Sequence, residues 1–137
     1  MIAQIKLWFQ KAVPNPTDKN LSVQIGCHFE EVSEMMEALG MDKMETTFVN
    51  TIADEFKSVK YEPELKINRQ EVLDALADQI VTAVGIAHML NMDIVGACEE
   101  VNRSNWSKFV NGEPVFKENG KIAKGPAYTE PDLSKFI

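Results

Sequence analysis

One stretch constrains the fold more than any other: RQEVLDALADQIVTAVGIAHMLN, which lies within residues 68–91. Its apolar residues occupy most of the circumference when they are projected at about 100° per residue, as in an α-helix. A helix of this kind is typical of the buried centre of a helical protein. We therefore expect it to be the centre of an all-α domain.

Four further segments have helical patterns bounded by capping or helix-breaking residues. The PNP sequence at residues 14–16 ends the first, because proline fixes φ and removes a backbone donor. Asp18 or Asn20 caps the second, and Gly40 ends it. Asp93 caps the last. The predicted helices cover residues 2–13, about 21–39, 41–60 and 94–109, and residues 61–68 form a connection.

The chain changes character after Phe109. Asn119-Gly120 stands between short alternating segments, which is a hairpin signal, and a proline-containing tail follows. The patterns together predict an all-α, four- to five-helix bundle with a small C-terminal hairpin and tail. We expect a single domain over residues 1–137, with a helical core at 1–109 and the hairpin and tail at 110–137.

Composition and charge exclude several classes of partner. The 137 residues are 45% hydrophobic and carry a formal net charge of −7, whereas nucleic acid demands clustered Lys and Arg. No apolar run reaches membrane-spanning length, and the N-terminal residues lack the cleavage site of a signal peptide. Cys27 and Cys98 form no CxxC pair, which fits free thiols in a reducing cytoplasm. We expect a cytoplasmic protein with no nucleic-acid or membrane partner.

Acidic residues lie beside apolar surface on two of the predicted helices. Glu31 and Glu34, within HFEEVSEMMEALG, lie together on the flank of an apolar stripe. On the long helix, Glu71, Asp74 and Asp78 form a narrow strip surrounded by apolar residues. The stripe beside the glutamates comprises Ile25, Val32, Met35, Met36 and Leu39, while Glu30 and Glu37 turn further toward solvent.

The acidic strip on the long helix needs a compensating positive charge, because neighbouring carboxylates repel and burial disfavours their charged forms. A divalent cation would supply it. If the two helices pack side by side, Glu31, Glu34 and Asp78 provide the hard oxygen ligands that Mg²⁺ prefers, joined by Asp74 or Glu71. The alternatives are a solvated acidic face on the first helix and structural ion pairs on the second.

Three blocks resemble a known family: HFEEVSEMMEAL, DALADQIVTAVGIAHMLNMDI, and EEVNRSNWSKF followed by GKIAKGPAYTEPDL. Their order is similar to that of the all-α nucleoside triphosphate pyrophosphohydrolases, the MazG-like and phosphoribosyl-ATP pyrophosphohydrolase-like group, in particular its small phage-type and mobile-element-type members. The resemblance spans most of the chain from His28 to Leu133. It implies an enzyme that uses Mg²⁺ or Mn²⁺ to cleave nucleoside triphosphates between the α and β phosphates, with nucleotide-pool house-cleaning as its role.

The resemblance also assigns roles to the acids. Glu31 and Glu34 match the family's ExxE metal ligands, and one of them is expected to be the base for the attacking water. Asp78 matches the aspartate of the family's ExxD motif. Ala75 stands where that motif has its glutamate, which leaves the fourth ligand open, with Asp74 and Glu71 as the nearest acids.

Cationic and amide side chains in NRSNWSK are expected to contact the triphosphate. Arg103 and Lys108 would offset phosphate charge, and the amide of Asn105 would meet a phosphate, a sugar or the metal. Without the resemblance, a helix C-terminus that favours cations through its dipole explains the same residues equally well.

Three residues outside that motif are further candidates for contact with the nucleotide. Lys121 and Lys124 follow the hairpin turn and are expected to close over the site of the same or a neighbouring subunit, with ordinary solvated lysines as the alternative. Trp8 is a candidate for stacking on the base, with packing near a helix end as the alternative.

Two function classes therefore compete. The first is a Mg²⁺-dependent pyrophosphohydrolase acting on (d)NTPs. The second is a non-catalytic helical oligomerisation or regulatory module that retains the fold, which Ala75 keeps open. In either case we expect a homo-oligomer, a dimer or a dimer of dimers, because one chain leaves apolar surface on its long helix uncovered and the relatives associate in this way.

Overall fold

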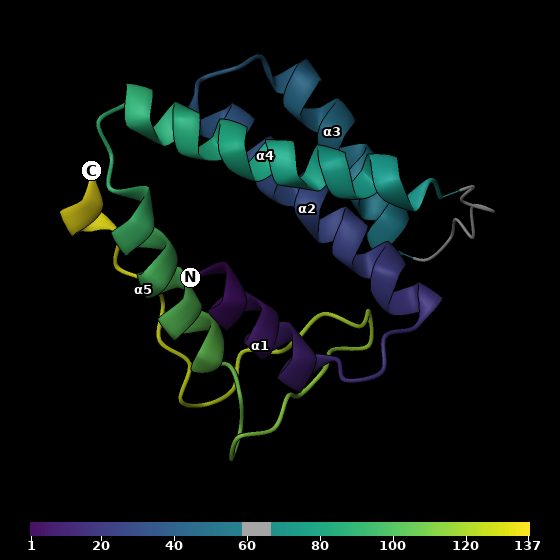
Figure 1. Ribbon diagram of the computed structural model, residues 1–137. Helices are drawn as coiled ribbons and strands as arrows, with labels where there is room; N and C mark the ends of the chain where they lie inside the picture. The colour runs from purple at the N-terminus through teal and green to yellow at the C-terminus, as the bar shows by residue number, and fades with distance from the viewer. Residues whose placement is uncertain (59–66) are drawn as a thin grey trace. The chain divides into compact units, whose positions relative to one another are not determined.

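A computed structural model describes residues 1–58 and 67–137, and the described residues are helical with connecting loops (Figure 1). No strand occurs among them, so the predicted all-α class is confirmed. Most of the predicted connection at 61–68 lies outside the described residues. The helices are α1 (Ile2–Ala12), α2 (Asp18–Ala38), α3 (Lys43–Lys57), α4 (Arg69–Met89), α5 (Ile94–Trp106) and the short 3₁₀ helix η1 (Ser134–Phe136).

Contacts along the chain divide it into two compact units. Unit 1 comprises Met1–Ala12, Glu64–Val115 and Lys124–Ile137, and so contains α1, α4, α5 and the C-terminal segment. Unit 2 comprises Val13–Pro63 and Phe116–Ala123, and so contains α2, α3 and the predicted hairpin. The single domain expected over residues 1–137 stays a prediction.

Side-chain caps fix where the helices begin. The cap of α2 is Thr17, and not Asp18 or Asn20 as the sequence suggested: the Thr17 hydroxyl accepts from the Asn20 backbone N–H at 3.2 Å. The Asn20 side chain in turn accepts from the Thr17 N–H at 3.0 Å, which completes a capping box. Asp42, Asn68 and Asp93 cap the next three helices, as a short acceptor side chain at this position does in general.

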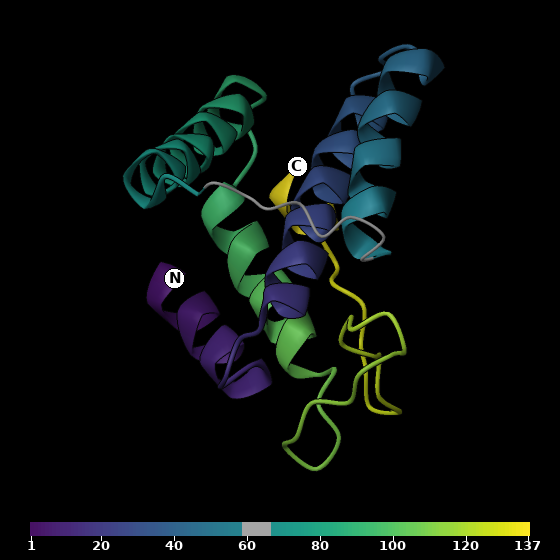
Figure 2. The same ribbon diagram turned by 90° about the vertical axis from the view of Figure 1, so that its right-hand side faces the viewer.

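Within unit 2, α2 and α3 lie side by side (Figure 2). Small residues make their closest contacts. Gly26 approaches α3 so tightly that an added methyl group would overlap backbone atoms of Ala53 and Lys57. The buried Ser33 hydroxyl donates to the Thr46 carbonyl at 3.1 Å, and the Ser22 hydroxyl donates to a second α3 carbonyl. Small side chains let two helix backbones approach, and these hydroxyls satisfy their own donors across the contact.

The predicted apolar stripe of α2 is therefore not the face that packs against α3. Ile25, Val32 and Met36 are half-buried, whereas Met35 and Leu39 are exposed. On α3, Met44 and Phe48 are also turned outward and are 78% and 68% exposed. Close approach of the small residues turns these larger side chains away from the helix pair.

Unit 1 has a small aromatic core. Trp8 stacks on Phe109 with ring centroids 5.8 Å apart, and Trp106 meets the same Phe109 ring edge-on at 5.4 Å. Trp8, Phe109 and Ala12 are buried, while Trp106 remains 40% exposed. Aromatic side chains bury large areas, so this cluster accounts for much of the contact of α1 with the end of α5.

The expectation that the long helix is a buried centre is wrong for the structure described. Ala87 is the only buried residue of α4. Its large apolar side chains are exposed, for example Leu73 at 70%, Val81 at 67% and Met89 at 82%. The sequence pattern detected the apolar circumference correctly, but the packing within unit 1 covers little of it.

By length and composition, α4 also meets the minimum for crossing a membrane, contrary to the expectation that no apolar run would do so. This is weak evidence, since core helices of soluble proteins meet the same minimum. Asp74 and Asp78 lie within the helix, and a carboxylate at the centre of a spanning helix costs roughly 2.5–3.5 kcal/mol to insert.

Candidate functional site

The two glutamates of the ExxE pair lie on the exposed side of α2. Glu31 and Glu34 are both exposed and stand three residues apart, so they are neighbours on the helix surface. They do not border a buried stripe as the projection suggested, because the buried residues of α2 are Ser22, Val23, Gly26 and Ser33.

Glu30, which was expected to face solvent, is half-buried and is held by two lysines. Lys57 donates to one carboxylate oxygen at 2.8 Å, and Lys121 donates to the other. Lys57 also pairs with Asp54 at 2.9 Å. Partial burial works to raise the pKa of Glu30, but the hydrogen bonds and charges of the two lysines outweigh it and lower the pKa. Glu30 is therefore a structural carboxylate of unit 2.

The Lys121 contact anchors the turn predicted at Asn119-Gly120. The turn forms with one bridge between Phe116 and Ile122 and no extended strand, and Gly120 adopts a positive φ of 82°. A residue without a side chain adopts this conformation at no steric cost. Lys121, 91 residues after Glu30 in the chain, thus places the turn against the helix that carries the ExxE pair.

The aspartates expected to complete the metal site lie on α4. Asp74 and Asp78 are exposed and one turn apart, but α4 belongs to unit 1 whereas Glu31 and Glu34 belong to unit 2. Within the described ranges, no three His, Cys, Asp or Glu side chains gather in a group that could hold a metal ion. The structure thus brings each acidic pair together on its own helix only, and the four-carboxylate Mg²⁺ site stays a prediction.

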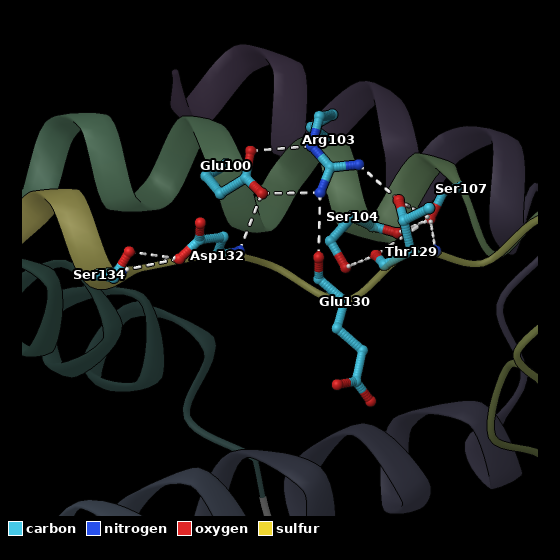
Figure 3. Close-up of polar contacts among 8 residues, drawn as sticks. All are labelled: Glu100, Arg103, Ser104, Ser107, Thr129, Glu130, Asp132 and Ser134. Carbon is cyan, nitrogen blue, oxygen red and sulfur yellow. Dashed lines mark hydrogen bonds and ion pairs between the residues drawn. The ribbon is translucent and has the colours of Figure 1, made fainter.

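Arg103, expected at the triphosphate, contacts the C-terminal segment instead (Figure 3). It forms a two-pronged ion pair with Glu100, through Nε at 2.8 Å and Nη2 at 2.7 Å. It also donates to the Thr129 hydroxyl and, at 3.1 Å, to the Glu130 carbonyl. Hydrogen bonds from Arg103, joined by one from the Asp132 backbone N–H, lower the pKa of Glu100 to about 2.

The other predicted triphosphate contacts of α5 lie near one another at its C-terminal end. Lys108 donates to the Asn105 side chain at 2.7 Å. The backbone N–H of Gly125 donates to the Lys108 carbonyl at 3.2 Å, and this sets Lys124 next to the same end of the helix. Lys124 is 57% exposed, lies 3.6 Å from Glu130 and covers the Tyr128 ring at 4.5 Å. The backbone of Lys124 thus lies near the end of α5 that carries Asn105 and Lys108, all within unit 1, while its side chain contacts Glu130 and Tyr128.

Trp8 belongs to the core of unit 1. Its ring is 7% exposed and packs between Phe9 and Phe109. Its buried Nε1 has no hydrogen-bond partner. The packing alternative therefore describes the structure, and a base could stack on Trp8 only if this cluster opened.

Three residues that organise these regions escaped the sequence analysis. Lys57 pairs with Glu30 one helix away, and Glu100 and Thr129 hold Arg103. The EEVNR spacing, which places Glu100 three residues before Arg103, was a detectable signal for an ion pair along one helix face. Nothing local in the sequence signals the contact of Thr129 with Arg103 or that of Lys57 with Glu30, because these partners lie 26 and 27 residues apart in the chain.

Comparisons with protein-family models, with curated proteins and with solved structures find no match for this chain. The family expected from the sequence blocks therefore stays a prediction.

Proposed function

We propose that the protein is a Mg²⁺-dependent nucleoside triphosphate pyrophosphohydrolase that converts (d)NTPs to (d)NMPs and pyrophosphate. One observation supports it most: each of two helices presents a pair of exposed carboxylates one turn apart, Glu31 with Glu34 on α2 and Asp74 with Asp78 on α4. Carboxylates in this spacing suit a hard divalent cation. The order of these pairs along the chain agrees with the sequence resemblance.

The chemistry fits the residue types. A bound Mg²⁺ would neutralise phosphate charge and make a coordinated water more acidic. Glu34 or Glu31 accepts a proton from the attacking water, whose oxygen forms a bond to phosphorus while the bridging bond between the α and β phosphates breaks. Asn105, Lys108 and Lys124 supply an amide and two positive charges for the phosphate oxygens.

An activity measurement tests the proposal. Purified protein is given the four dNTPs, the four NTPs and phosphoribosyl-ATP, with and without Mg²⁺, and released pyrophosphate is measured. Mg²⁺-dependent release from at least one substrate, lost in Glu34→Gln and in Asp78→Asn with helicity retained, is the expected result. Absence of release from every substrate contradicts the proposal, and full activity in either variant contradicts that residue's role.

A second candidate function is a non-catalytic helical oligomerisation or regulatory module. The engagement of Arg103 with the C-terminal segment favours it, since four of the five N–H donors of a guanidinium are accounted for by protein contacts. Ala75, in place of a fourth family carboxylate, favours it too. The module binds no nucleotide and releases no pyrophosphate, so the same assay separates the two functions.

Both candidates include association of identical chains in the cytoplasm. Exposed apolar side chains along α4, such as Leu73, Val81 and Met89, support a dimer or a dimer of dimers because large apolar patches are rare on monomers. Sedimentation at micromolar concentration tests this, and a monomer is the contradicting result.

A further inference from the structure

An extended C-terminal segment, here called the strap (Thr129–Phe136), runs along α5 in the opposite direction (Figure 3). The Thr129 N–H donates to the Ser107 hydroxyl at 2.9 Å, and the Thr129 carbonyl accepts from Ser104 at 2.8 Å. Further along, the Asp132 N–H donates to Glu100 at 3.0 Å. The contacts of the strap thus follow α5 from its C-terminal end toward its N-terminal end.

The strap ends at the first turn of α5. The Asp93 N–H donates to the Phe136 carbonyl at 2.8 Å, and the Phe136 ring occupies the space that a side chain at Gly96 would need. The lengths agree, because α5 rises about 21 Å from Asp93 to Ser107, and an extended chain ending in a 3₁₀ turn covers about 20 Å from Thr129 to Phe136. The strap is therefore about as long as α5.

Arg103 lies at the middle of this contact and links both sides of it. It binds Glu100 on its own helix, and it binds Thr129 and the Glu130 carbonyl on the strap. Glu100 in turn accepts from the strap at Asp132. A planar guanidinium provides fixed donor directions that an ammonium does not, so this four-contact arrangement requires arginine.

The segment that precedes the strap is fixed to the other end of α5. A β-carbon at Gly125 would lie 2.7 Å from the Val110 side chain and 2.9 Å from the Lys108 carbonyl, so the backbone there can approach only as glycine. Lys124 precedes this contact, and its side chain is 57% exposed. The position of Lys124 beside Asn105 and Lys108 thus depends on how the chain after it is held.

We propose that Arg103 and Glu100 are positioning residues, which hold the strap along α5 and thereby place Lys124 beside Asn105 and Lys108 for contact with the substrate triphosphate. This inference rests on the proposed function for the role of Lys124. It replaces the direct triphosphate contact expected for Arg103, since four of the five donors of that side chain are engaged by Glu100 and by Thr129 and Glu130 of the strap.

Amide hydrogen exchange tests the holding of the strap without any activity measurement. Arg103→Gln and Glu100→Gln should each speed exchange at the Thr129 and Asp132 amides about tenfold, the effect of losing roughly 1.4 kcal/mol of local stability. Lys6→Gln, on the exposed side of α1, is the matched control and should leave both amides unchanged. Unchanged exchange in Arg103→Gln would overturn the anchoring role.

A double-mutant cycle tests whether Arg103 acts through Lys124. Arg103→Gln and Lys124→Gln should each raise KM for the Mg²⁺-triphosphate complex about tenfold with kcat unchanged, and the double variant should be no worse than either one. Arg103→Lys should raise KM nearly as much as Arg103→Gln does, because lysine keeps the positive charge but lacks the planar guanidinium group. A KM raised about a hundredfold in the double variant, or a wild-type KM in Arg103→Lys, would indicate that Arg103 contacts the triphosphate directly. Either result would overturn the inference.

Failure of the proposed function has a different signature. If the wild-type protein hydrolyses no triphosphate, both the proposed activity and the substrate role of Lys124 are wrong. The exchange measurement then still decides the anchoring role, because it requires no substrate.

Discussion

The α-carbon of Gly26 faces the backbone of Ala53 so closely that a β-carbon at Gly26 would lie 2.6 Å from the Ala53 carbonyl oxygen. Ala53 itself is fully buried. This contact sets the separation of α2 and α3, the helix pair whose α2 surface carries Glu31 and Glu34.

Gly26→Ala should destabilise the protein by about 1–3 kcal/mol, because overpacking forces two helix backbones apart. Gly85→Ala is the matched control. Gly85 lies inside α4 with nothing within 4 Å of an added β-carbon, so alanine should be stabilising there by roughly 0.5–1 kcal/mol through helix propensity. Urea unfolding measures both changes, and equal effects of the two substitutions would contradict the close approach.

Ser33→Ala should cost about 1 kcal/mol, since the fully buried Ser33 hydroxyl donates to Thr46 across the helix pair. Thr82→Ala provides the comparison, because the exposed Thr82 hydroxyl bonds only to carbonyls of its own helix. That change should be neutral or slightly stabilising. The free energy of unfolding checks both predictions. An unchanged free energy of unfolding in Ser33→Ala would contradict a stabilising role for this hydrogen bond.

Lys121→Met should release the segment Phe116–Ala123 from α2 by removing its ion pair with Glu30. The loss of stability is expected to be roughly 1 kcal/mol, because the pair is only partly shielded from water and Lys57 still holds Glu30. Faster amide exchange at Gly120 and Lys121 is the direct readout. Lys117→Met, at an exposed position of the same segment, should not produce it.

The Glu100 carboxylate makes the strap sensitive to acid. Its pKa in the folded protein, about 2, lies below the ordinary value of 4.5, so the charged form stabilises the folded state. That contribution is complete above about pH 4.5 and is lost as the pH falls toward 2. Protection of the strap amides, taken relative to their intrinsic exchange rates, should therefore fall across this range in the wild type and in Glu99→Gln. In Glu100→Gln the fall should be smaller, because only Asp132, whose pKa is lowered by hydrogen bonds from Ser134, then contributes on the strap. A profile identical to that of the wild type would contradict the assignment.

Much of the secondary structure follows from local sequence. Prolines and capping residues mark most helix ends, and Asp93 caps α5 as predicted, because these signals act through neighbouring backbone groups. The packed face of α2 does not follow from the same reasoning. A projection weighted by apolarity selects Met35 and Leu39, whereas the closest approach to α3 is made by glycine and serine, whose small size matters more than their polarity, beside the stacked rings of Phe29 and Phe56.

The candidate site was predictable only in part. The spacing of Glu31 and Glu34 places both on one exposed surface whatever the tertiary contacts are. The contact of Arg103 with Thr129 and that of Lys121 with Glu30 join segments 26 and 91 residues apart, and sequence spacing carries no information about such contacts. Charge together with the family resemblance assigned these two cations to a phosphate, while the structure pairs them with carboxylates of the protein.

Binding of Mn²⁺, followed by electron paramagnetic resonance, tests the central claim most directly, because the proposed activity requires that the exposed carboxylates of the protein bind a divalent cation. Glu34→Gln and Asp78→Asn should each weaken Mn²⁺ affinity about tenfold or more, because each removes one of the carboxylates on which the proposed activity depends. Mn²⁺ affinity equal to that of the wild type in both single variants would contradict the account.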